Sequence, residues 1–124
     1  MEEFVAYVDN NSKNNEFFLE QFQNWLAKQK IEVTNIQKYI VNCKYYLDYI
    51  EQEFMETMEE GCFLTCAFFE DYIKLNITEE DNQFIYDMVD SLKTFYQCMS
   101  ELKYISSTDY VDLCDDLMQV LDNL

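Results

Sequence analysis

The sequence lacks proline and histidine, and among its 124 residues it has a single glycine, Gly61. Tight hairpins and other special turns depend on glycine and proline, so this chain can hardly build a β-rich architecture. Histidine is the usual acid–base group near neutral pH, and a glycine-rich loop is the usual cradle for phosphate. The architecture that remains possible is one of long helices joined by short polar loops. Because the usual acid–base and phosphate-binding groups are missing, we also predict that the protein is not an enzyme.

Long apolar runs and an export signal are missing as well. No segment approaches the about 18 uninterrupted apolar residues that a membrane span needs. The N-terminus, Met1-Glu2-Glu3-Phe4, has neither the positive region nor the apolar stretch of a signal peptide. We therefore expect a cytoplasmic protein without a membrane segment. In that compartment we interpret the five irregularly spaced cysteines as small buried hydrophobic residues rather than as disulfides.

The cysteines and acids form no recognisable metal or catalytic motif. Cys62 and Cys66 share a helix face at i, i+4, but a structural zinc needs two further ligands and no Cys-x-x-Cys spacing occurs. Carboxylate-bridged metal sites in helical bundles usually include histidine, which this chain lacks. The sequence therefore predicts no cofactor, no metal and no catalytic residue.

Apolar residues recur with helical spacing in five segments, which predicts an all-α fold. The expected helices span about residues 15–29, 34–53, 57–75, 78–102 and 107–121. Ser12, Asn14 or Asn15 is expected to cap the first helix. Thr34, Thr57 and Thr78 each begin a sequence typical of a helix N-terminus, with Gln or an acid three residues later.

The same pattern predicts one domain, residues 1–124. Residues 14–121 are expected to form a single four- to five-helix bundle. Residues 1–13 are expected to form an arm, in which the apolar residues 4–8 make either a helical turn or a segment packed on the bundle.

Most of the ten tyrosines and ten phenylalanines fall on the apolar faces of the expected helices. We interpret them as core residues rather than as a stacking platform for single-stranded nucleic acid, which also needs a positive groove. Phe54, Phe63 and Leu102 are among the residues expected to face inward. Three tyrosines lie partly off the apolar stripe of the second helix and are the best candidates for exposed contacts: Tyr45, Tyr46 and Tyr49.

The net charge of −17 is unevenly distributed along the chain. Residues 1–50 carry a net charge of −2, whereas residues 51–124 carry −15. Such blocks indicate either an interaction surface or a solvating face. The acidic candidate surface, for a basic protein partner, consists of Glu70, Asp71, Glu79, Glu80, Asp81, Asp87 and Asp90. The candidate surface for DNA consists of Lys28, Lys30, Lys38 and Lys44.

Several stretches resemble a known family. They are Phe18-Leu19-Glu20, Asn24-Trp25-Leu26, residues 31–39 and residues 46–50, followed later by residues 91–99, Ile105-Ser106 and Asp109-Tyr110. Together they resemble the N-terminal core-binding domain of tyrosine recombinases and phage integrases, in the stand-alone form found in small uncharacterised microbial proteins. The resemblance covers about residues 14–121 and is poor over 70–83. It implies a SAM-like helical bundle that clamps duplex DNA beside a separate catalytic domain.

Two functions from different classes follow. The first is a non-catalytic interaction module on a recombinase core-binding-like scaffold, whose acidic C-terminal half binds a basic protein partner. The alternative is an accessory DNA-binding domain that acts through the lysines of the first two helices. Affinity for duplex DNA comes mainly from Lys and Arg at the phosphates, and this chain has no arginine, so we favour the first. An acidic face that only gives solubility is the third interpretation, and the oligomeric state is open.

Overall fold

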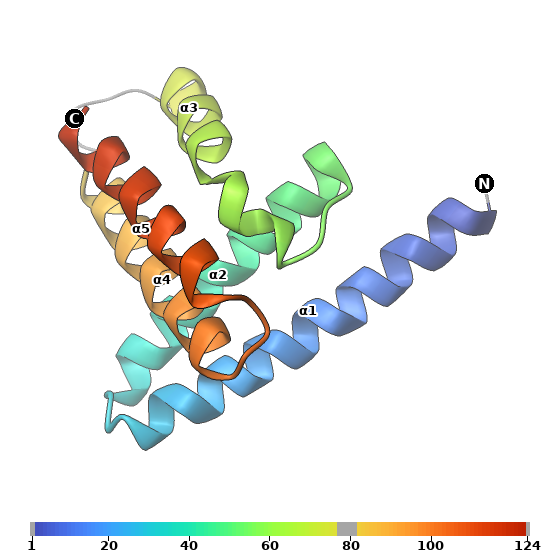
Figure 1. Ribbon diagram of the computed structural model, residues 1–124, viewed down its shortest axis with the longest axis horizontal. Helices are drawn as coiled ribbons and strands as arrows, with labels where there is room; N and C mark the ends of the chain where they lie inside the picture. Colours follow the sequence, from blue (N-terminus) through green and yellow to red (C-terminus); the bar gives the residue numbers. More distant parts are fainter. Residues whose placement is uncertain (1, 77–81, 124) are drawn as a thin grey trace.

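The computed structural model describes the backbone of residues 2–76 and 82–123, and the side chains of residues 11, 13–71 and 82–123. Its elements are α1 (Glu2–Lys28), α2 (Val33–Phe54), the short 3₁₀-helix η1 (Glu60–Phe63), α3 (Thr65–Asn76), α4 (Asn82–Glu101) and α5 (Ser107–Asp122). Every element in the described backbone is helical, which confirms the predicted all-α bundle (Figure 1). None of these helices is long and apolar enough to cross a membrane.

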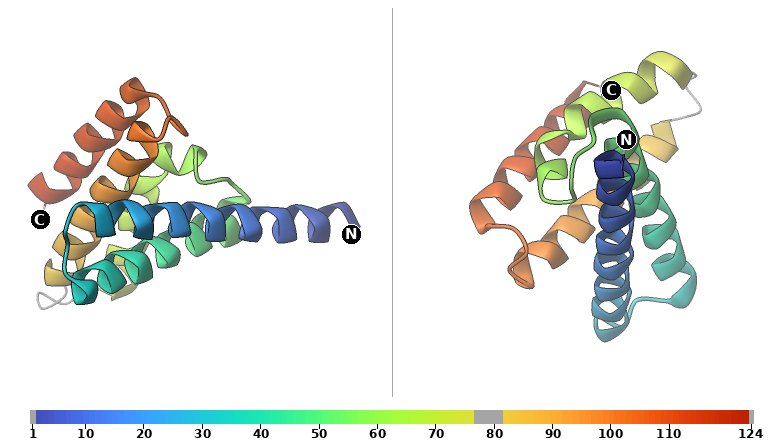
Figure 2. Two further views of the ribbon diagram at one scale, coloured as in Figure 1. Left: turned by 90° about the horizontal axis from the view of Figure 1, so that it is seen from below. Right: turned by 90° about the vertical axis from the view of Figure 1, so that its right-hand side faces the viewer.

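Helix α1 begins at Glu2 rather than near residue 15, so the predicted start of the first helix is wrong and residues 2–13 are part of that helix. Its N-terminal turns project beyond the other helices, and its C-terminal half lies beside α2 (Figures 1 and 2). The expected caps, Ser12, Asn14 and Asn15, therefore lie inside a continuous helix. Asn11 instead makes a tertiary contact, because its side-chain amide donates to Glu51 and to the backbone carbonyl of Glu56.

The turn between α1 and α2 determines where α2 begins. Lys30 adopts a left-handed conformation with φ 60°, and the N–H of Ile31 donates to the carbonyl of Leu26. The N-cap of α2 is then Glu32, without a side-chain cap. Thr34 is the second residue of the helix, so the predicted capping box at Thr34 is wrong.

The core forms where α1, α2 and α4 meet. Phe22 of α1 packs edge-on against Phe95 of α4, with ring centroids 5.2 Å apart, and both side chains are fully buried. Burial of each such side chain stabilises the fold by about 1.5–3 kcal/mol. The predicted inward residues of α4 are confirmed in the main, since the following are buried: Ile85, Met88, Leu92, Phe95, Tyr96 and Met99.

Three apolar residues expected to face inward are exposed. Phe54 is the last residue of α2, Leu102 follows the end of α4, and Phe63 belongs to η1 rather than to a longer helix. The opposite error concerns Tyr46, which was expected to be exposed and is fully buried. Of the other two tyrosines, Tyr45 is exposed as predicted and Tyr49 is half-buried.

The segment between α2 and α3 differs most from the sequence-based expectation. Thr57 does not open a helix; η1 begins at Glu60 and α3 begins at Thr65. Two buried tyrosines hold this segment. The hydroxyl of Tyr46 donates to the carbonyl of Gly61 at 2.5 Å, and the hydroxyl of Tyr96 donates to the carbonyl of Met58 at 2.8 Å. Each of the two buried hydroxyls thus finds an acceptor in a backbone carbonyl of this segment.

Gly61 lies where these tyrosines approach most closely. A Cβ atom on Gly61 would lie 2.3 Å from Tyr96 Oη and 2.9 Å from Ile50 Cδ1. The one glycine of the chain is therefore required by the close approach of side chains and not by a positive φ, since no glycine has one.

The α4–α5 turn follows the sequence signal closely. Helix α5 begins at Ser107, as predicted, and Ser106 is its N-cap, with Oγ accepting from the N–H of Asp109 at 3.0 Å. The indole N–H of Trp25 donates to Glu101 at 2.8 Å, which ties α1 to the end of α4. The predicted start signal at Thr78 lies outside the described residues.

We predict that Gly61→Ala destabilises the protein by about 2 kcal/mol or more, because overpacking of a tight core costs about 1–3 kcal/mol. Without the clash, the same change would stabilise by about 0.4–1 kcal/mol through the unfolded chain. Urea unfolding of Gly61→Ala, Tyr96→Phe and the double variant measures the effect.

The double variant should be less destabilised than the sum of the two single variants, because Tyr96→Phe removes the atom that the new Cβ meets. Strict additivity, or a Gly61→Ala variant as stable as wild type, would contradict the close approach.

Candidate functional site

The lysines of the DNA candidate surface do not form one basic patch. Lys38 on α2 pairs with Asp87 on α4 at 3.0 Å, and Lys44 pairs with Asp48 at 3.0 Å. Lys28 is the last residue of α1 and Lys30 is in the following turn, and both are exposed. Two of the four predicted lysines thus already have a carboxylate partner.

Lys38 belongs to a polar hollow between α2 and α4, where the two predicted surfaces meet. Tyr39 Oη donates to Asp90 at 2.8 Å, and burial together with this carboxylate raises the pKa of Tyr39. The residues that line the hollow are Asn35, Lys38, Tyr39, Asp87, Asp90 and Ser91. Asp87 and Asp90 of the acidic candidate surface are therefore engaged with Lys38 and Tyr39 within the chain.

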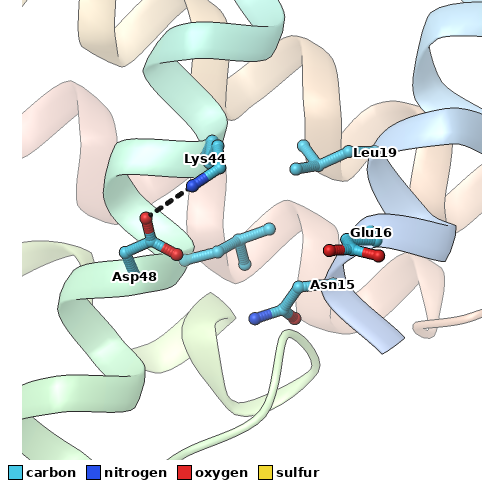
Figure 3. A pocket seen from close by; sticks show the side chains of 6 residues that line it. Asn15, Glu16, Leu19, Lys44 and Asp48 are labelled. Atoms are coloured by element: carbon cyan, nitrogen blue, oxygen red, sulfur yellow. Dashed lines mark hydrogen bonds and ion pairs between the residues drawn. The ribbon is translucent and has the colours of Figure 1, made fainter. Parts of the chain in front are cut away.

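A second hollow lies between α1 and α2 (Figure 3). The Lys44–Asp48 pair forms one side, and Asn15 and Glu16 lie on the α1 side. Its volume, about 80 Å³, is far below the about 300–1,000 Å³ of small-molecule sites. Asn15 is 6% exposed, and no group in the described part of the chain donates a hydrogen bond to its Oδ1.

The other acids of the acidic candidate surface also differ in whether they have a partner within the chain. Asp71 on α3 accepts a hydrogen bond from the hydroxyl of Tyr49, and burial and Asp71 raise the pKa of Tyr49. Glu70 is exposed and lines a hollow between α3 and α5. Glu79, Glu80 and Asp81 lie outside the described residues. Of the described acids in the set, Glu70 alone has no partner that the structure shows.

The sequence-based selection missed the aspartates of α5. With 3.6 residues per turn, Asp109, Asp112 and Asp116 at i, i+3 and i+7 share one flank of the helix. Asp115 and Asp122 are exposed and lie about a quarter turn or more around the helix from the centre of this row, on the side of α5 that faces away from the core. The i, i+3, i+7 spacing was visible in the sequence and was the signal available for finding this row.

Two thiols show which side of α5 this row faces. Burial, followed by the charges of Asp116 on α5 and Glu70 on α3, raises the pKa of Cys66. Cys62 experiences burial and the nearby Asp109, Glu59 and Glu60, which raise its pKa to about 12. The Asp109–Asp112–Asp116 flank therefore lies near η1 at its Asp109 end and near α3 at its Asp116 end, with Asp112 between them on the helix.

We name this set the acidic face. It consists of Glu59, Glu60, Glu70, Asp109, Asp112 and Asp116. Among the side chains that the structure describes, no lysine forms an ion pair with any of them, since the two pairs present involve Asp48 and Asp87.

The described cysteines and acids are not arranged as a metal cluster or as disulfides. No group of three or more cysteine or acid side chains there is placed to hold a metal ion. All five cysteines are free, with Cys43, Cys62 and Cys98 buried and Cys66 and Cys114 partly buried. Burial raises the pKa of Cys98 to about 12, so its thiol stays protonated and weakly nucleophilic near neutral pH.

Comparisons with protein-family models, with curated proteins and with solved structures found no match. The resemblance of residues 14–121 to recombinase core-binding domains therefore stays a prediction.

We predict that at most two of the five thiols react with a disulfide reagent at pH 8 in the folded protein. Cys43, Cys62 and Cys98 should react only after unfolding in urea, because their pKa values are raised above the ordinary value of 9.0. In the unfolded chain, reactivity should rise as the pH passes about 9; in the folded chain, Cys62 and Cys98 need a pH near 12. Thiol counting by absorbance tests this, and rapid reaction of three or more folded thiols would contradict it.

Proposed function

We propose that the protein is a non-catalytic helical interaction module that binds a basic protein partner through its acidic C-terminal half. The observation that supports the proposal is the acidic face, where carboxylates of α5 lie near acids of η1 at one end and of α3 at the other, with no lysine ion pair in the described part of the chain. Clustered charge of one sign steers a partner of opposite charge and speeds its association.

The acids that we assign to the partner surface differ from the set predicted from the sequence. Glu70 is kept from the predicted set, whereas Asp71, Asp87 and Asp90 are engaged with Tyr49, Lys38 and Tyr39. The α5 aspartates take their place. A recombinase core-binding-like scaffold remains part of the proposal only through the sequence resemblance.

DNA binding is the weaker candidate for a physical reason. Counterion release at the phosphates depends on lysine in a chain without arginine, and contacts through Lys38 or Lys44 would compete with Asp87 and Asp48. Lys28 and Lys30 remain, and two contacts give little of the counterion release that drives duplex binding.

A pull-down from the native cells with a matched pair of variants tests the proposal. Wild type and the control Glu16→Lys/Glu20→Lys/Glu32→Lys should retain a basic protein, and Glu70→Lys/Asp112→Lys/Asp116→Lys should lose it. Both variants change the net charge equally, so only the location of the charges differs. Retention should also fall with salt, because exposed charges are screened.

Equal loss with both variants would show that net charge alone acts, and a retained partner without basic character would overturn the proposal. A duplex-binding titration is the companion measurement. Binding at low salt that Lys28→Glu/Lys30→Glu abolishes would favour the DNA function instead.

A further inference from the structure

The hollow between α3 and α5 has an apolar floor and a charged rim. Cys66, Phe69 and Val120 line it, together with Glu70, Gln119 and Asn123. Phe69 and Val120 are 1% and 8% exposed, so their side chains form the floor. The raised pKa of Cys66 keeps that thiol neutral. Figure 1 shows the two helices beside each other at one end of the molecule, with their C-terminal ends on the same side.

The rim carries negative charge on both helices. Glu70 lies on the α3 side and Asp116 on the α5 side, and both charges act on the Cys66 thiol. Asp112 and Asp109 continue the α5 rim toward η1, one to two turns away. An apolar floor between two acidic rims complements an occupant that presents an apolar side chain flanked by cations.

The volume of the α3–α5 hollow and the helical fold around it limit which kind of partner can bind there. The volume, about 210 Å³, is below that of small-molecule sites and suits one or two side chains of a larger partner. Among the described residues there is no sheet edge to which an extended peptide can add a strand, and an apolar hollow between two helices suits an amphipathic helix laid into a groove. A second copy of this chain is disfavoured, because it brings a further net charge of −17.

We infer that this α3–α5 groove is the docking site for a basic amphipathic helix of the partner. An apolar side chain of that helix fills the hollow over Phe69 and Val120. Its lysines or arginines, spaced one turn apart, meet Glu70 on one rim and Asp112 and Asp116 on the other. The inference rests on the proposed function and specifies where and in what form the basic partner binds.

Synthetic peptides test the inference without an identified partner. The probe is a labelled peptide of about 18 residues, five turns, made of leucine and lysine with the leucines on one face. One comparison peptide has the same composition with the faces scrambled, and another has alanine in place of leucine. Fluorescence anisotropy at physiological salt should show at least tenfold tighter binding of the amphipathic probe than of either comparison peptide.

The protein variants are matched on the same helix. Asp112→Lys/Asp116→Lys should weaken binding of the amphipathic probe at least tenfold, whereas Asp115→Lys/Asp122→Lys, with the same charge change on the outer face, should weaken it less than threefold. Circular dichroism and urea unfolding confirm that both variants fold.

Cys66 provides an independent readout of location. The bound probe should slow alkylation of Cys66 at least fivefold at mildly alkaline pH and leave Cys114, on another flank of α5, unchanged. If both double variants weaken probe binding equally, or if the bound probe does not protect Cys66, the α3–α5 groove is not the docking site. The proposed function would not be contradicted by that result. If no cationic peptide binds at all, the proposed function fails together with the inference.

Discussion

The architecture of the C-terminal half depends on how two buried tyrosines hold the chain between α2 and α3. Tyr46 and Tyr96 come from different helices, and each donates its hydroxyl to a carbonyl of the segment that contains η1. Both carbonyls also accept a backbone N–H, Met58 from Gly61 at 3.1 Å and Gly61 from Leu64 at 3.3 Å, so the buried tyrosine hydroxyls are the groups that depend on these contacts. A buried hydroxyl left without a partner costs about 1–3 kcal/mol. The segment leads directly into α3, whose Cys66 and Phe69 line the hollow beside α5, so the contact at Gly61 fixes the chain just ahead of the α3–α5 groove.

Sequence periodicity predicted the helices that have one clear apolar face. Helix α4 illustrates this, because its core face follows from residue spacing alone. The errors arose where a tertiary contact overrides a local signal. Thr34 resembles a cap, but α2 follows the left-handed turn at Lys30 and its N-cap is Glu32, two residues earlier. Tyr46 lies partly off the apolar stripe, and its burial depends on a carbonyl 15 residues away that the sequence does not reveal.

The sequence alone predicted that the candidate site is acidic, but not which acids lie together in it. Counting charges shows that acids collect after residue 50, which is the basis for proposing a basic partner. It does not show that Asp87 faces Lys38 across two helices, or that Asp71 meets Tyr49. The α5 row was recognisable as a helix flank, yet its alignment with Glu70 depends on the packing of α3 against α5. Pairing between elements decides which acids are engaged and which stay available.

The position of the acids without an ion-pair partner helps to distinguish a surface that binds a partner from one that only makes the protein soluble. Solubility depends on net charge and is served equally well by carboxylates dispersed over the surface. On the acidic face, Glu70 and Asp116 both act on the Cys66 thiol from two different helices, so like charges face the same groove and repel each other. That repulsion opposes the packing of α3 against α5 in the free chain. A cationic helix in the groove would relieve it, so binding and packing would favour each other, which a purely solubilising surface does not require.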